Sequence, residues 1–344
     1  MSKLISIITP TYNHERYIGE CIESVLKQTY KNWEMLIVDD ASSDKTVEIV
    51  EKYANVDSRI KLILHDENYG PYRLKDTYNE AFKISKGEYI AILEGDDYWP
   101  EYKLEEQVKF FDENDNDIIL CCGECQVVND KGKGITYYKT SDITNNPIGS
   151  SISFFASLSS PVSSQSLMIK RWALEKICGF QGDSSLPLID WTTATALSLI
   201  GGFGYIHKNM GFWRRHDKSV AYNYGKDMKI TKTYQKWFID FLESNKTQIE
   251  KLGFHYDTNE VMKRQNATMK EMEDKQNYYN GAFLLSIGNF NEARKCFYGA
   301  LKQKNNSIKF LIKYKGASVL GILCIYIKID LISKIRLFIV KMRR

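Results

Sequence analysis

The sequence lacks the cysteine pattern of a disulfide-bonded protein. Its seven cysteines are odd in number and irregularly spaced, which favours a reducing compartment. Cys122 and Cys125 form a CxxC pair, but no second pair and no pair of histidines lies nearby in the sequence. Two buried strand cysteines are therefore favoured over a metal or redox site.

Long apolar segments are also missing. Met1 to Thr9 leads directly into a strand-like segment, so we expect no secretory signal. The longest uncharged stretch of the final segment, Ala317 to Ile327, is shorter than the ~20 apolar residues that a membrane-spanning helix needs. We therefore expect no transmembrane helix there.

Neither of the two glycine-rich nucleotide fingerprints occurs. No GxGxxG follows the first predicted strand, and the chain contains no GxxxxGK[ST]. A bound diphosphate would therefore have to be neutralised by a metal ion and by side chains.

Positive charge is concentrated at one end of the chain. Residues 309–344 carry six Lys and three Arg against one Asp, whereas the net charge of all 344 residues is only +4. The rest of the chain has no basic stripe with interleaved aromatic residues, so we expect no nucleic-acid binding. With 43% hydrophobic and 26% charged residues, the composition is that of a folded soluble protein with room for two domains.

The first hundred residues alternate between apolar runs and amphipathic repeats. The runs Leu4–Thr9, Met35–Val38, Ile60–Leu64 and Glu88–Leu93 are typical of buried strands, and the helical periodicity between them indicates amphipathic helices. This alternation predicts an α/β fold with a mostly parallel sheet, helices on both of its faces and right-handed crossovers.

Three polar clusters follow these strands: Thr9 to Asn13, Asp39–Asp40, and Glu94 to Asp97. Ligands of parallel sheets bind outside the carboxyl ends of the strands, so we expect the clusters to converge on one edge. Neighbouring carboxylates repel unless a cation lies among them, and oxygen ligands favour Mg²⁺ or Mn²⁺. For the third cluster, a solvated acidic turn before a helix is the alternative.

Four blocks of sequence carry a resemblance to a known family. They are SIITPTYN (6–13), LKQTYKNWE (26–34), IVDDASSD (37–44) and GEYIAILEGDD (87–97). Together they resemble the family 2 glycosyltransferases of the GT-A fold, with a looser similarity to about residue 220. The resemblance implies a nucleotide-sugar donor such as a UDP-sugar, a divalent metal cofactor (Mn²⁺ or Mg²⁺), and inverting transfer to a glycan or lipid-linked acceptor.

The resemblance assigns donor-binding roles to several residues. Asp40 matches the family's aspartate that accepts a hydrogen bond from a uracil-like N–H, and Pro10 and Tyr12 would flank that base. Arg73 matches an arginine that contacts the diphosphate. A solvated helix residue is the alternative for Arg73.

Glu94-Gly95-Asp96 occupies the position of the family's DxD motif. Asp96 would be the direct metal ligand. Glu94 stands where the family usually has Asp, and its extra methylene leaves open whether it contacts the metal or the ribose of the nucleotide-sugar. Asp97 would support the nucleotide-sugar site indirectly, by contacting the ligand residues.

Asp190 is the predicted catalytic base. It resembles the second acid of the family's Glu-Asp motif, with Ile189 in place of the usual glutamate. An aspartate at a helix start beside apolar Trp191 can take the proton of a sugar hydroxyl. A helix N-cap is the alternative.

Residues 211–216, GFWRRH, resemble the family's segment that closes over the diphosphate. Arg214 and Arg215 would supply positive charge to the nucleotide-sugar. His216 would be an additional metal ligand or a donor to phosphate.

The resemblance and the periodicity predict three regions. Residues 1–224 would form the catalytic domain, with a nucleotide-binding half (1–100) and an acceptor half (101–224) in which the polar stretch 141–166 forms a loop-rich acceptor wall. Residues 225–308 are helical in pattern. Within them, Asn280 to Leu301 resembles one tetratricopeptide unit, which would dock a protein partner, although ordinary helix packing is the alternative.

The last predicted region, residues 309–344, mixes basic and apolar residues. Such a tail is expected to bind an anionic membrane surface. It predicts a cytoplasmic protein attached peripherally to the inner face of the cytoplasmic membrane.

Two other functions remain open. Glu94 and Ile189 depart from the family pattern, which makes a noncatalytic sugar-binding scaffold conceivable. A nucleotidyltransferase would share a metal and an α/β sheet, but it should show a glycine- and lysine-rich triphosphate loop that this sequence lacks.

Overall fold

The computed structural model describes residues 2–114, 117–138, 151–156, 158, 162–187, 189–220, 228–302 and 316–326. The chain divides into two compact units. The first comprises residues 1–125, 138–213 and 236–258, and the second comprises residues 126–137, 214–235 and 259–344. Within the described ranges, no helix has both the length and the apolar character needed to cross a bilayer.

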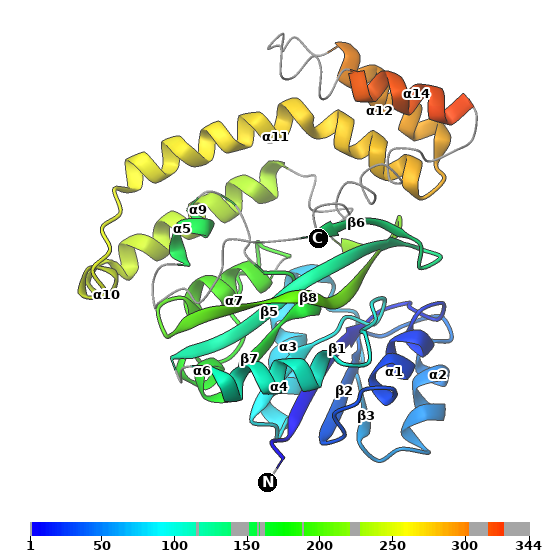
Figure 1. Ribbon diagram of the computed structural model, residues 1–344, viewed down its shortest axis with the longest axis vertical. Coiled ribbons are helices and arrows are strands. Elements are labelled where there is room, and N and C mark those ends of the chain that lie inside the picture. The colour runs from blue at the N-terminus through cyan, green and yellow to red at the C-terminus, as the bar shows by residue number, and fades with distance from the viewer. Residues whose placement is uncertain are drawn as a thin grey trace. The chain divides into compact units, whose positions relative to one another are not determined.

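Four parallel strands, in the order β3-β2-β1-β4, form one half of the sheet in the first unit, as the alternating pattern predicts (Figure 1). Register pairs Ile5 with Trp33 and with Tyr89, and Met35 with Ile60. Each strand is joined to the next by a helix or a 3-10 turn and a helix. In chain order the elements are β1 (Ile5–Thr11), α1 (Ile18–Leu26), β2 (Trp33–Asp39), α2 (Thr46–Ala54), β3 (Ile60–Leu64), η1 (Pro71–Arg73), α3 (Leu74–Ile84) and β4 (Tyr89–Ile92).

The second half of the sheet is antiparallel where it joins the first. Strand β7 runs antiparallel to both β4 and β5, and the strand order is β3-β2-β1-β4-β7-β5-β6, with β8 paired to β5. The fold is therefore a mixed α/β sheet. Its later elements are α4 (Lys103–Glu113), β5 (Ile118–Asn129), β6 (Gly134–Tyr138), α5 (Ile152–Phe155), η2 (Ser164–Ser166), β7 (Met168–Lys170), α6 (Arg171–Lys176), α7 (Asp190–Leu197) and β8 (Gly202–Arg215).

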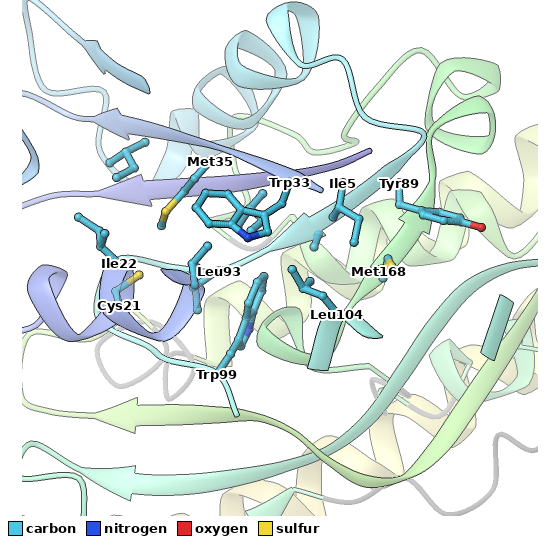
Figure 2. Close-up of a cluster of buried hydrophobic side chains, with 14 of the residues drawn as sticks. Ile5, Cys21, Ile22, Trp33, Met35, Tyr89, Leu93, Trp99, Leu104 and Met168 are labelled. Carbon is cyan, nitrogen blue, oxygen red and sulfur yellow. The ribbon is translucent and has the colours of Figure 1, made fainter. Parts of the chain in front are cut away.

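Helices cover both faces of this sheet. Alternate strand residues point to opposite sides, and Ala91 and Met168 pack with α1 and with Leu104 of α4 in the main core, which is built around Trp33 and Trp99 (Figure 2). The neighbouring strand residues Ile92, Leu120 and Ile169 instead line a cavity with α7. The apolar face predicted for α1 is the buried one: Ile18, Cys21, Ile22 and Val25.

The sequence periodicity of two elements, α4 and β8, does not predict the helix and the strand that they form. Helix α4 buries Lys103 and Gln107 together with Leu104 and Val108, so its inward face is partly polar. Strand β8 contains three glycines among basic and aromatic residues. Gly204 approaches Phe110 so closely that a Cβ would lie 2.3 Å from its ring. Packing rather than periodicity therefore determines both elements.

The later helices are α9 (Met228–Ser244), α10 (Lys246–Lys251), α11 (Thr258–Ser286), α12 (Phe290–Lys302) and α14 (Gly316–Tyr326). In the second unit, the end of α11 turns into α12 at Gly288, whose φ is +80°. Phe297 of α12 is fully buried, and Gly281 of α11 and Gly321 of α14 both lie against its ring. Helix α14 thus packs on the predicted tetratricopeptide-like pair and buries part of its apolar face.

Two predicted regions fall largely outside the described residues. Most of the predicted acceptor wall, residues 141–166, lies there, with only 151–156, 158 and 162–166 described. Of the predicted membrane-binding tail, only residues 316–326, which form α14, are described.

Candidate active site

The ends of β1, β2 and β4 are tied together at one edge of the sheet. The amide of Asp40 donates to the carbonyl of Thr11 at 2.9 Å, and the amide of Gly95 donates to the carbonyl of Pro10 at 3.0 Å. Asn13, whose φ is +54°, donates its amide to Ser42 Oγ at 2.8 Å. Three polar clusters separated by up to about eighty residues of chain therefore meet at one place.

The carboxylate of Asp40 is almost buried and has several donors. Its Oδ1 accepts from the amide of Tyr69 at 2.8 Å, and its Oδ2 accepts from the amide of Gly70 at 2.9 Å. Nδ1 of His65 lies 2.8 Å from the same Oδ1. Asp40 therefore anchors the loop between β3 and η1 as well as lying at the end of β2.

The preceding residue, Asp39, has a different environment. It is fully buried, and its two oxygens accept from the amide and the hydroxyl of Ser42, both at 2.7 Å. Burial nevertheless raises the pKa of Asp39. Asp39 therefore closes the turn after β2 and does not face the edge of the sheet with a free oxygen.

Gly95 lets the acidic motif approach the end of β1. A Cβ at this position would lie 2.6 Å from Thr11 Oγ1 and 2.9 Å from His14 Nδ1, which is closer than side chains pack. His14 Nε2 in turn lies 4.0 Å from Asp96 Oδ2. The structure thus adds His14, a residue that the sequence patterns did not single out, to the surroundings of the predicted metal ligand.

Glu94 is enclosed beside Asp96. Its Oε1 accepts from the hydroxyl of Tyr78 at 3.0 Å, whereas its buried Oε2 has no hydrogen-bond partner. Burial, together with the negative charge of Asp96, raises the pKa of Glu94 to about 7, and the nearby Ser164 hydroxyl opposes this shift only in part. Glu94 is therefore a carboxyl group with one oxygen left to bind a cation or a donor.

Asp97 is buried, and its amide donates to the carbonyl of Glu94 at 3.0 Å. This bond closes the tight turn that carries the acidic motif.

Asp190 begins α7 and lines an apolar cavity with Ile92, Phe180 and Ile189. Burial raises its pKa to about 6, although its Oδ1 accepts from the amide of Trp191 at 3.0 Å. It is the first helical residue and not the N-cap, which is Ile189. The carboxylate is therefore placed where the charged form is disfavoured, which is the environment of a base that works near neutral pH.

Tyr78 connects the two unusual carboxyl groups. Its side chain is buried and donates to Glu94. Burial is the main reason that the pKa of Tyr78 lies well above its usual value, and the negative charges of Glu94 and Asp190 raise it further. Helix α3 therefore supplies one phenol that lies near both acids. Nothing in the sequence singles out Tyr78, because tyrosine on the inner face of a helix is ordinary core.

The remaining predicted donor residues of the first unit are more exposed. The side chain of Tyr12 is at the surface. The guanidinium of Arg73 lies 3.6 Å from the centre of the Tyr69 ring and pairs with Glu67 at 3.2 Å and Asp76 at 3.4 Å. Arg73 is therefore held at the surface of the loop that Asp40 anchors.

The predicted residues 214–216 belong to the second unit. Arg214 is buried, and its Nη1 donates to the carbonyl of Asp130 at 3.2 Å. Arg215 lies 5.9 Å from the ring of Phe283, and the amide of His216 donates to Ser219 Oγ at 3.1 Å. Their roles in donor and metal binding stay predictions.

Glu94 and Asp96 are the candidate ligands for a metal ion. Within the described ranges, no three His, Cys, Asp or Glu side chains are grouped as metal ligands. Glu94 and Asp96 nevertheless provide two neighbouring oxygen ligands, and the unpartnered Oε2 of Glu94 and its raised pKa mark uncompensated negative charge. A hard divalent cation fits these two residues, provided that the donor or water completes its coordination.

The two cysteines of the CxxC pair are buried strand residues. Cys122 and Cys125 are both fully buried in β5, and burial raises the pKa of each thiol to about 12. The interpretation as core residues is confirmed for these side chains, since a thiol this hard to ionise is a poor metal ligand or redox group.

Comparison with known proteins agrees with this arrangement. Residues 6–171 match the family described as Glycosyl transferase family 2. Glycosyltransferase GlyG of Streptococcus pneumoniae is 39% identical over 120 residues, which are 35% of this chain and 39% of that protein. The Escherichia coli protein WfgD, a UDP-Glc:alpha-D-GlcNAc-diphosphoundecaprenol beta-1,3-glucosyltransferase, is 42% identical over 126 residues, which are 37% of this chain and 47% of that protein. The chain thus spans less than half the length of these relatives.

Solved structures show the same fold over more of the chain. The crystal structure of residues 1–349 of S. aureus TarS has a TM-score of 0.55 and 18% sequence identity, and the match covers 94% of this chain and 88% of that one. TarS has also been solved in complex with UDP-GlcNAc, with the same TM-score. The chain therefore has a GT-A-like fold, and its residues 6–171 belong to glycosyl transferase family 2.

Proposed function

We propose that this protein is an inverting glycosyltransferase that moves a sugar from a UDP-sugar to a hydroxyl of a cell-surface glycan or lipid-linked acceptor. The family match of residues 6–171 supports the reaction class. The name of the E. coli relative specifies a UDP-sugar and a diphosphoundecaprenol-linked acceptor, which supports both substrate classes. The S. aureus protein of similar fold was crystallised with UDP-GlcNAc.

One observation carries the proposal: Asp190, a half-buried residue that lines an apolar cavity, shares the neighbour Tyr78 with the acidic motif without belonging to that motif. Asp190 has its pKa raised to about 6 by burial, and it influences the same tyrosine, Tyr78, that donates to Glu94. An inverting transfer needs such a division of labour, because one acid group must stay with the donor while another takes a proton from the acceptor. A simple sugar-binding scaffold has no use for a second carboxyl group held at this cost.

The chemical step is a single displacement. The acceptor hydroxyl gives its proton to the carboxylate of Asp190 while its oxygen bonds to the anomeric carbon of the donor sugar. The bond from that carbon to the β-phosphate oxygen breaks on the opposite side, and UDP leaves with the electron pair. Because attack and departure occur on opposite sides, the configuration at the anomeric carbon inverts.

Glu94 and Asp96 would hold the divalent cation, Mn²⁺ or Mg²⁺. Bound there, the cation supplies positive charge that neutralises the diphosphate. The chain itself holds Glu94 through Tyr78 and places Asp96 beside His14. Asp40 would accept from the N–H of the uracil base, Pro10 and Tyr12 would flank it, and Arg73 would bind the phosphates.

The test of this function is hydrolysis and transfer of UDP-sugars by the purified full chain. UDP release should require a divalent cation and should increase when glycan or lipid-linked acceptors are added. Asp96→Asn should lose cation-dependent UDP binding, because a neutral amide cannot replace an anionic ligand. If UDP is released from every UDP-sugar tested without a cation and without an increase on addition of acceptor, the proposal is wrong.

We also propose that residues 309–344 bind an anionic membrane surface from the cytoplasmic side. Each Lys or Arg near such a surface contributes ~1 kcal/mol, and salt screens this attraction. Exchanging the Lys and Arg residues of 327–344 for Gln should abolish co-sedimentation with anionic vesicles at low salt while leaving α14 intact. Equal sedimentation of both proteins would contradict the idea.

The helix pair α11 and α12, already covered in part by α14, is a proposed docking site for a protein partner.

A further inference from the structure

The buried histidine His65 lies between two carboxyl groups. Only 2% of its side chain is exposed. Its Nδ1 lies 2.8 Å from Asp40 Oδ1, and its Nε2 lies 2.9 Å from Glu80 Oε2. An ionised carboxylate only accepts hydrogen bonds, so His65 satisfies both partners only when both ring nitrogens carry hydrogen. His65 is then a buried cation that joins the end of β2 to α3.

Asp40 consequently has one acceptor position left. A carboxylate offers about four lone-pair sites, two on each oxygen. On Oδ1 they are taken by the amide of Tyr69 and by His65, and on Oδ2 one is taken by the amide of Gly70. Because a carboxylate has no hydrogen to donate, the remaining position of Asp40 can only accept a hydrogen bond.

The groups around His65 reinforce this charge pattern. The ring of Tyr69 packs against the imidazole of His65 with ring centres 4.0 Å apart, and the guanidinium of Arg73 lies 3.6 Å from the centre of the Tyr69 ring. Arg73 is itself paired with Glu67 and Asp76. The charged groups that His65 contacts are therefore the carboxylates of Asp40 and Glu80, whereas Arg73 contacts the ring of Tyr69.

We propose that His65, held by Glu80, is a positioning residue that makes the donor site selective for a base with an N–H at the Watson–Crick edge. A uracil-type base carries a donor at N3, which suits an acceptor-only Asp40. A cytosine carries an acceptor at the same atom and would require Asp40 to be protonated. This inference rests on the proposed function, in which Asp40 contacts the base, and adds how the chain enforces the choice of nucleotide.

The test measures binding of UDP and CDP to the full-length protein by calorimetry with the same divalent cation throughout. Glu80→Gln keeps the shape and a hydrogen bond to His65 but allows the imidazole to be neutral. His65→Gln removes the cation itself. We expect His65→Gln to weaken UDP binding by roughly tenfold, as for a lost charge-assisted hydrogen bond. The preference of this variant for UDP over CDP should decrease by a similar factor. Glu80→Gln should show both effects to a smaller degree.

The matched control is Glu48→Gln, an exposed member of an ion pair on helix α2, which should bind both nucleotides as the wild type does. A purely structural role would weaken UDP and CDP equally, so an unchanged ratio in both His65→Gln and Glu80→Gln overturns the inference. If His65→Gln does not fold, the ratio in Glu80→Gln decides. Asp40→Asn separates the two proposals, because full UDP affinity in that variant would overturn the base contact of Asp40 itself.

Discussion

Two carboxylates of the first unit, Asp40 and Asp190, show opposite ways of using an acidic side chain. Asp40 lies among three donors, two of them backbone amides of its own anchored loop. Asp190 has one amide donor from its neighbour and otherwise lines an apolar cavity. The first environment stabilises the charge and holds it in one place, whereas the second makes the charge costly and raises the pKa to about 6.

This difference separates binding from proton transfer. A group that only accepts a hydrogen bond from a ligand gains from a fixed, fully ionised state. A group that must take a proton during a reaction gains from a pKa close to the working pH. Glu94 resembles Asp190 in its raised pKa but resembles Asp40 in its position at a strand end. This is consistent with a carboxyl group whose charged form a bound cation would stabilise.

The largest expected effect comes from removing the base. Asp190→Asn retains the shape and the hydrogen bond from Trp191 but cannot take a proton, so sugar transfer should fall by roughly 10² to 10⁴. UDP affinity should stay near that of the wild type, as measured by calorimetry. Asp183→Asn, an exposed aspartate a few residues earlier, is the control and should transfer normally. A near wild-type rate in Asp190→Asn would place the base elsewhere.

The next effect tests the close packing of the acidic motif. In Gly95→Ala the new Cβ would meet Thr11 Oγ1 at 2.6 Å, so the motif must move away from β1. A displacement of this kind can reduce transfer by up to ~10²-fold, which steady-state kinetics with a UDP-sugar would show. Gly19→Ala in α1 is the matched control, since its nearest neighbour would be the Tyr53 hydroxyl at 3.8 Å. Equal rates for the two variants would mean that the motif tolerates the shift.

The third prediction concerns pH. A base must be unprotonated to act, and burial raises the pKa of Asp190 to about 6. The rate of the transfer step should therefore be constant above this value and fall about tenfold for each pH unit below it. Circular dichroism at each pH would confirm that the protein stays folded. A rate that is unchanged down to pH 5 would exclude Asp190 as the titrating base.

The smallest effect is on stability, and it distinguishes an aspartate whose pKa is raised from one whose pKa is lowered. Because the folded-state pKa of Asp190 is raised, the folded protein binds the proton more tightly than the unfolded chain, and stability is lost as pH rises from about 4 to about 6. Asp190→Asn should therefore increase the free energy of unfolding at pH 8 by on the order of 2 kcal/mol. Asp183, whose pKa is lowered by the Ser185 hydroxyl, should give no increase when changed to Asn. Urea denaturation of both variants would measure this contrast, and a destabilised Asp190→Asn would favour a structural role for that side chain.

The sequence by itself determined the parallel half of the fold. The buried strands, the face of α1 and the convergence of Thr11, Asp40 and Glu94 on one edge all followed from local patterns. The physical reason is that period and composition specify strands and helices locally, while the handedness of crossovers leaves few ways to assemble them. Spacing alone was therefore sufficient to bring residues far apart in the chain together.

Only the tertiary structure decided which neighbours these residues have. Nothing local marks His14, His65 or Tyr78 as partners of the acidic groups, because each is an ordinary residue on a loop or an inner helix face. The antiparallel attachment of β7 and the pattern-free β8 depend on long-range pairing and on glycines that admit a neighbouring ring. Burial and the charges that face a group determine its pKa, and both are properties of the packed chain rather than of its sequence pattern.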